Sequence, residues 1–291
     1  MMMNAAPVRT YKLLTVIAVA GMFGCATQEG RLKTDTFVAR KKLTSELVAR
    51  QEWETAFAYA DDLHREQPRD AEVLVLRGKI YREKGLPTEA ENDLLSAIRL
   101  DENFAEAHAA LAIVYDVGMR PHEAEKHHKE AVRLDPRNAM YLNNLGFSLY
   151  LRGKNQEAIK VYSEAARMMP TNRRLRTNLG FALAATGDFR RAAHEFEMGG
   201  VPAEAKNNLG FAYERKGDLK NAYELYAEAV RLDPASTKVR SNLANAAKIL
   251  GRELPEDLPP VPVTAPVSPV TPPSIVSPPS PKSPAKEDVK P

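Results

Sequence analysis

The chain has 291 residues, 27% of them charged, and a formal net charge of +3. Acidic and basic residues are mixed, with no basic run and no base-stacking cluster, so the composition indicates a solvated surface and argues against nucleic-acid binding. The single cysteine excludes an internal disulfide.

Residues 1–24 are typical of a signal peptide. Arg9 and Lys12 precede an apolar run, residues 13–23, that is too short to span a bilayer. The run ends in Phe23-Gly24-Cys25, which resembles a bacterial lipobox, where a small residue precedes a cysteine that becomes lipidated. The alternative is an ordinary cleaved signal with an incidental cysteine.

The lipobox resemblance implies a location. It predicts lipidation of Cys25, and residues 25–36 form a polar tether behind it. Because Ala26, not aspartate, follows the cysteine, the resemblance implies sorting to the periplasmic face of the outer membrane.

A repeat of 34 residues organises residues 37–254. In residues 139–170, two apolar stripes at helical spacing flank Gly153, which predicts a helix–turn–helix hairpin. With Ala139 as position 1, small residues recur at positions 8, 20 and 27. Examples are Gly146, Ala158 and Ala165; Gly78, Ala90 and Ala97; and Gly210, Ala222 and Ala229. Large apolar or aromatic residues recur at position 24, namely Leu94, Tyr162, Phe196 and Tyr226, and His128 is the exception.

These positions resemble the tetratricopeptide repeat (TPR). The resemblance implies an all-α, right-handed solenoid of about six hairpins plus a capping helix from Thr237 to about Leu250. The repeat that begins at Arg173 is four residues short, at residues 197–202. We expect an altered stacking angle there and no domain boundary.

Residues 255–291 are rich in proline, including Pro259-Pro260 and Pro272-Pro273. Proline at this density predicts an extended or disordered tail. A passive spacer and a docking tail for an envelope partner are both open readings.

Sequence motifs for catalysis or metal binding are not found. In residues 122–128, His122 is followed by histidines at i+5 and i+6, whereas an HExxH zinc site needs i and i+4. His128 occupies a core position of its repeat, so a packed histidine is expected. Without a nucleophile–base pair, we predict a non-enzymatic protein with no cofactor and no metal site.

The TPR resemblance also implies a concave groove lined by the first helix of each hairpin, at positions 2, 5, 6, 9 and 12. Asparagine recurs there at positions 5 and 6, and phenylalanine at position 9. These residues resemble the asparagine ladder of peptide-binding TPR proteins: Asn143, Asn144, Phe147, Asn178, Phe181, Asn207, Asn208, Phe211 and Asn242. In the alternative reading, the asparagines bond neighbouring helices and the phenylalanines complete the core.

Signal, lipobox and repeats together resemble the TPR lipoproteins of pilus assembly. Residues 107–150 are similar to the type IV pilus pilotin, and residues 143–218 to the TPR lipoprotein of tight-adherence (Flp) pili. The resemblance implies a protein-binding scaffold in pilus assembly or secretion, lipid-anchored in the outer membrane, with a secretin or other pilus component as partner. An adaptor of peptidoglycan or other envelope machinery is the alternative.

Overall fold

The structure is a computed structural model that describes residues 36–260. Within this range every regular element is a helix, which confirms the all-α prediction. None of the described helices is long and apolar enough to cross a membrane. Cys25, the signal peptide and residues 261–291 lie outside the described range.

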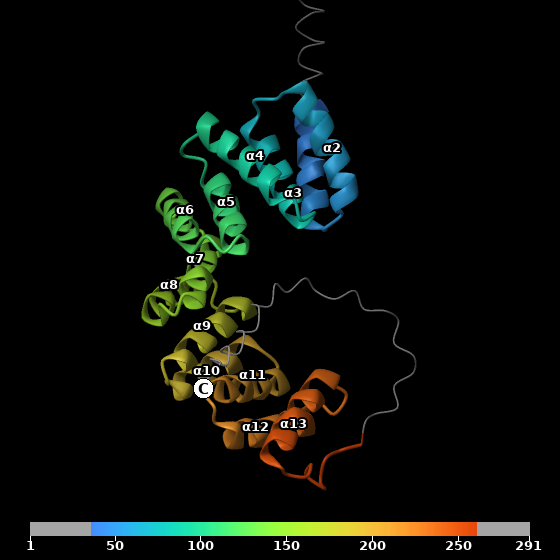
Figure 1. Cartoon of the computed structure of the whole chain (residues 1–291), viewed down its shortest axis with the longest axis vertical. Coiled ribbons are helices and arrows are strands. Elements are labelled where there is room, and N and C mark those ends of the chain that lie inside the picture. Colours follow the sequence, from blue (N-terminus) through green and yellow to red (C-terminus); the bar gives the residue numbers. More distant parts are fainter. Residues whose placement is uncertain (1–35, 261–291) are drawn as a thin grey trace, which may run out of the picture. The chain divides into compact units, whose positions relative to one another are not determined.

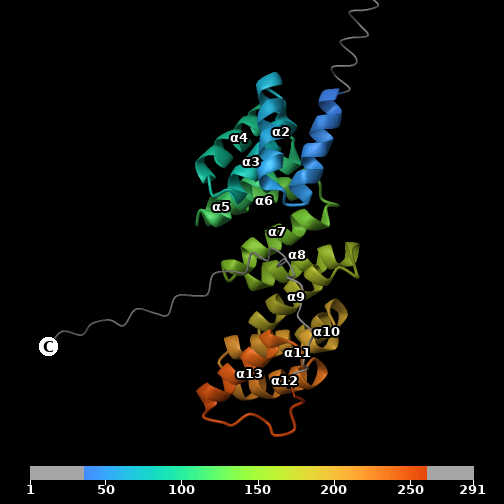
Figure 2. The same ribbon diagram turned by 90° about the vertical axis from the view of Figure 1, so that its right-hand side faces the viewer.

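The chain divides into two compact units, residues 1–134 and 135–291 (Figures 1 and 2). In unit 1, residues 36–49 are helical and precede α2 (Trp53–Glu66), α3 (Ala71–Glu83), α4 (Pro87–Leu100), α5 (Ala105–Val117) and α6 (Pro121–Leu134). Helix α3 packs against α4, and α5 against α6, as hairpins.

Unit 2 contains α7 (Ala139–Leu151), α8 (Asn155–Met168), α9 (Arg173–Ala185), α10 (Phe189–Gly199), α11 (Pro202–Arg215), α12 (Leu219–Leu232) and α13 (Thr237–Leu250). Its hairpins are α7–α8, α9–α10 and α11–α12, and α13 packs against α12. The first helices of successive hairpins also touch, α7 with α9 and α9 with α11.

The two helices of a hairpin meet where the small residue at position 8 lies opposite the large residue at position 24. A Cβ atom added to Gly146 would lie 2.8 Å from the ring of Tyr162, and one added to Gly180 would lie 2.6 Å from Phe196. Both rings are fully buried. Glycine is therefore needed at these crossings because any side chain would occupy the space of the ring.

The turn within each hairpin needs a left-handed residue at position 15. Glycine supplies it in most repeats: Gly85, Gly153, Gly187 and Gly217 all have φ between 74° and 88°. Met119, between α5 and α6, adopts the same conformation with φ 57°, and so does Gln51 with φ 62°. A side chain in this region is strained, so these two turns are less favourable than the others.

The short repeat ends in a short helix. Helix α10 has 11 residues, whereas α8 and α12 have 14 each. Its last residue, Gly199, packs closely, since an added Cβ would lie 2.7 Å from the Cβ of Arg176 on α9. The two units divide after Leu134 and not at this repeat.

Residues 251–260 have no helix but pack against the last two helices. The Tyr223 hydroxyl donates to the Glu253 carbonyl at 2.8 Å, and Arg231 bonds both oxygens of Asp257 at 2.8 and 3.0 Å. Leu258 contacts the apolar cluster of α12 and α13. Nη2 of Arg240 donates to the Pro259 carbonyl at 2.5 Å. The segment therefore runs back along α13 and covers the end of unit 2.

Candidate protein-interaction site

The predicted ladder residues all lie in unit 2, on the first helices of its hairpins and on α13. Helix α7 carries Asn143, Asn144 and Phe147; α9 carries Asn178 and Phe181; α11 carries Asn207, Asn208 and Phe211; and α13 carries Asn242. We call the surface that these residues share the ladder face. Their peptide-binding role stays a prediction.

Four of the asparagines form two bridges between helices. Nδ2 of Asn178 donates to Oδ1 of Asn143 at 2.8 Å, and Nδ2 of Asn242 donates to Oδ1 of Asn207 at 2.8 Å. Asn143 and Asn207 are only 2% and 4% exposed. The bridges thus satisfy two buried amide oxygens and link α7 to α9 and α11 to α13. This geometry is what the alternative reading predicts for these four residues.

The α9–α11 junction is built differently. Thr177 stands where the other junctions have asparagine, and the described contacts include no bridge from Asn208. Instead, the Phe181 and Phe211 rings meet edge-on, with centroids 6.0 Å apart. Phe181 also contacts the buried Phe196 ring at 4.9 Å. Because Phe211 is 41% exposed, the aromatic contact extends from the core to the surface.

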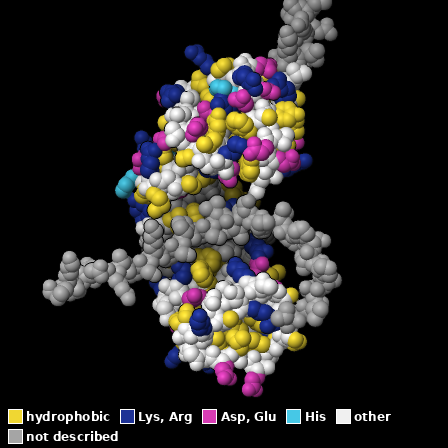
Figure 3. Space-filling view, turned by 45° about the vertical axis from the view of Figure 1, so that its right-hand side comes forward, with side chains coloured by type: hydrophobic (Ala, Val, Ile, Leu, Met, Phe, Trp, Pro, Cys, Tyr) yellow, Lys and Arg dark blue, Asp and Glu magenta, His cyan; other side chains and the backbone are white. Residues whose placement is uncertain are grey.

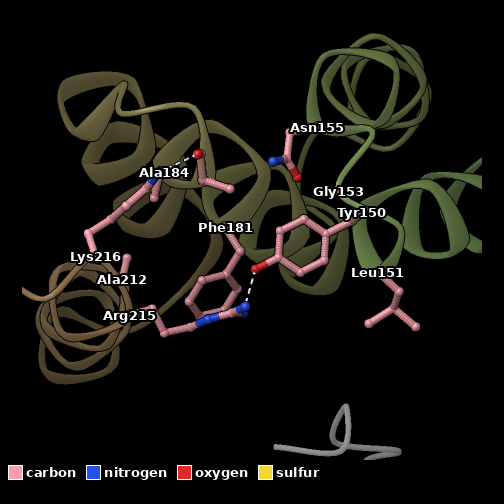
Figure 4. A pocket seen from close by; sticks show the side chains of 10 residues that line it. Tyr150, Leu151, Gly153, Asn155, Phe181, Ala184, Ala212, Arg215 and Lys216 are labelled. Carbon is pink, nitrogen blue, oxygen red and sulfur yellow. Dashed lines mark hydrogen bonds between the residues drawn. The ribbon is translucent and has the colours of Figure 1, made fainter. Parts of the chain in front are cut away.

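A pocket of about 310 Å³ opens beside Phe181 (Figure 4). Its lining residues come from α7, α9, α11, the turns after α7 and α11, and the first residue of α8: Tyr150, Leu151, Gly153, Asn155, Phe181, Ala184, Ala185, Ala212, Arg215 and Lys216. The lining includes apolar and aromatic side chains, two cations and one amide, and it includes no carboxylate. It therefore suits an apolar group that carries hydrogen-bond acceptors.

Arg215 and Tyr150 join the two sides of this pocket. Nη1 of Arg215, at the end of α11, donates to the Tyr150 hydroxyl on α7 at 2.7 Å, and the guanidinium lies 5.8 Å from the ring centroid. Lys216 donates to the Ala185 carbonyl at the end of α9 at 2.7 Å. Burial raises the pKa of Tyr150, so its hydroxyl stays protonated at neutral pH.

Tyr150 and Arg215 are not among the site residues predicted from the sequence. Tyr150 occupies position 12, one of the positions that the TPR resemblance directs into the groove, so the residue could have been found. Arg215 lies one position further along its own repeat, and its contact with Tyr150 spans 65 residues. No local pattern indicates such a contact.

The histidines of unit 1 do not form a metal site with carboxylates. Nε2 of the buried His128 lies 2.8 Å from Oδ2 of Asp116, and the ring is packed as its repeat position predicts. The ring of His127 stacks on His108, with their Nδ1 atoms 2.9 Å apart. Among residues 36–260, no three His, Cys, Asp or Glu side chains gather as metal ligands do.

Comparison with known proteins identifies the repeat. A tetratricopeptide-repeat profile matches residues 139–172 and 203–236, and a second profile of the same repeat matches residues 71–104. These segments begin at the position-1 residues of the predicted register, which confirms that register for three repeats. The chain thus contains TPR hairpins, the class of helical repeat that typically serves as a scaffold for protein binding.

Many solved structures share this fold. Among them are PilW, described as a widely conserved type IV pilus biogenesis factor (18% identity, 72% of this chain and 98% of PilW, TM-score 0.61), and PilF of Pseudomonas aeruginosa (18%, 72% and 97%, 0.57). YrrB, described as a TPR protein with an unusual peptide-binding site, is also similar (22%, 65% and 97%, 0.52). No curated protein sequence matched.

Proposed function

We propose that this chain is a non-enzymatic adaptor whose ladder face binds an extended segment of a protein partner. The observation that carries the proposal is the combination of half-exposed phenylalanines, asparagines and the Tyr150–Arg215 pocket along successive first helices. Phenylalanine rings offer apolar contact area, and amides can bond both the N–H and the C=O of a peptide backbone.

The amide bridges reduce the set of residues that can contact a ligand. Asn143 and Asn207 are buried and paired, so they hold the helices of the ladder face in place. Asn144 and Asn208, together with Phe181 and Phe211, remain as the groups that meet a ligand. On the lower part of Figure 3, hydrophobic side chains lie next to dark-blue Lys and Arg, and magenta Asp and Glu lie at its lower edge. The pocket beside Phe181 carries Arg215 and Lys216 and no carboxylate, which suits a partner segment that is apolar and neutral or acidic.

A role in pilus assembly or secretion is the finer part of the proposal. Fold likeness to the pilus biogenesis factor PilW supports it. Lipidation of Cys25, predicted from the sequence, would anchor the adaptor at the periplasmic face of the outer membrane. A secretin or another pilus component is the proposed partner. Labelled palmitate should enter the wild-type protein and not the Cys25→Ala variant.

Site-specific photocrosslinking tests the ladder face. A photoreactive phenylalanine analogue at Phe211 should capture one envelope protein in cells, identified by mass spectrometry. The matched control is the same analogue at Leu232, which is 53% exposed at the end of α12. Capture from Leu232 alone, or equal capture from both positions, would contradict binding at the ladder face.

A further inference from the structure

Residues 266–286, beyond the described range, repeat in triplets. Reading PVS-PVT-PPS-IVS-PPS-PKS-PAK, every first residue is proline or isoleucine, and every third residue is serine or threonine except the last. A polyproline II helix has three residues per turn, so this pattern gives it one Pro/Ile edge and one Ser/Thr edge. A passive spacer does not require such a period.

The rise of one triplet matches the distance between neighbouring first helices of the ladder face. One polyproline II turn rises about 9 Å. Packed helices lie about 8–10 Å apart, and the first helices of unit 2 touch or are bridged in succession. Each turn of the ligand can therefore meet one first helix. Four helices span about 30 Å, so three or four triplets are sufficient.

The chemistry of the two surfaces also agrees. Proline rings dock on aromatic side chains, and the ladder face offers Tyr150, Phe181 and Phe211. Proline has no N–H, so its burial leaves no unsatisfied donor, while the carbonyl groups need donors such as Arg215. Residues 261–281 carry no charge, so they meet the cations of the pocket without repulsion.

Residues 251–260, which precede the triplets, already bind unit 2 in this manner. Arg240 donates to the carbonyl of Pro259, and the neighbouring Leu258 packs on the apolar cluster of α12 and α13. These contacts hold residue 260 against unit 2. At about 3.1 Å per residue, the fifteen residues from there to Ile275 reach up to roughly 46 Å. The triplet segment can therefore reach the ladder face of its own chain.

We infer that the triplet segment, residues 266–286, occupies the ladder face in cis and competes with the partner. The inference rests on the proposed function, because it assigns an occupant to the same face. Tethering gives the segment an effective concentration of about 1 mM. A partner therefore has to displace the tail, so the tail lowers the apparent affinity of the ladder face for weakly binding partners.

The test compares two full-length chains, both Cys25→Ser so that neither is lipidated. One has the natural tail, and the other has residues 266–286 in a scrambled order without the period of three. The probe is a fluorescent synthetic peptide of residues 264–286, followed by anisotropy. We expect the scrambled-tail chain to bind it at least about tenfold more tightly, because its ladder face is vacant.

The variant Phe211→Ser in the scrambled-tail chain should lose this binding while its circular dichroism stays unchanged. Equal affinity of the two chains, or no binding by either, would overturn the inference. So would dimers of the natural chain in sedimentation, because they would show docking between copies. Photocrosslinking of a partner at Phe211 is independent of these results, so the proposed function can stand where the tail inference fails.

Discussion

Met119 occupies a turn position where most other repeats have glycine, and replacing it should stabilise unit 1. Its φ of 57° costs a non-glycine residue about 1–2 kcal/mol. The side chain is 81% exposed, so Met119→Gly loses little buried surface. Glycine is more flexible in the unfolded chain, which offsets part of the gain. We expect a net stabilisation of about 1 kcal/mol.

The single tryptophan makes the stability change of unit 1 measurable. Trp53 packs beside the core of α2 and α3, so its fluorescence in urea reports on unit 1. A gain of about 1 kcal/mol should raise the thermal midpoint of unit 1 by roughly 4–8 °C. The matched reverse change is Gly153→Met in unit 2, where no atom lies within 4 Å of an added Cβ, so only the backbone cost applies.

Gly153→Met should lower stability by a similar amount, seen by circular dichroism and not by Trp53 fluorescence. A lower midpoint for Met119→Gly would refute the reasoning, because it would mean that the exposed methionine contributes more than its backbone conformation costs.

Two further predictions concern packing and pH. Gly146→Ala should lower the free energy of unfolding in urea by about 1–3 kcal/mol. In the Tyr162→Leu background the same change should cost less, because the ring that the new methyl group meets is then absent. Additive losses in the double variant would contradict this reasoning. Burial, followed by neighbouring His108, lowers the pKa of His127 to about 4. Below pH 6.5 the unfolded chain protonates this histidine, whereas the folded chain does not until about pH 4. The free energy of unfolding of unit 1 should therefore fall by about 1–2 kcal/mol between pH 6.5 and pH 4, after allowance for the partial exposure of the ring. His127→Phe should reduce this loss.

The helices and their packing could be predicted from the sequence because each repeat carries the same local information. Position 8 and position 24 meet within one hairpin. A small residue such as Gly146 at one position therefore predicts that a large residue such as Tyr162 packs against it at the other. Position 15 is fixed by the turn, and glycine indicates it in most copies. Met119 shows the limit, since the repeat imposes the conformation even where the residue disfavours it.

The details of the ladder face could not be predicted in this way, because they depend on contacts between repeats. Asparagine at position 5 bonds asparagine at position 6 of the next repeat, as Asn143 does with Asn178. One repeat read by itself gives both residues the same apparent role. The His108–His127 pair and the Arg215–Tyr150 contact likewise join helices whose relative rotation the repeat pattern does not specify.

The asparagine bridges affect the free energy of the ligand binding that is proposed for the ladder face. Association costs free energy for every side chain or helix that must be ordered at the moment of binding. The Asn143–Asn178 and Asn207–Asn242 bridges fix the spacing of α7 to α9 and of α11 to α13 before any ligand arrives. Between them, the α9–α11 junction relies on the rings of Phe181 and Phe211 instead of an amide bridge. Binding free energy can therefore be directed to the aromatic junction and its adjoining pocket, and substitutions there should weaken a ligand more than equal substitutions at the bridged ends.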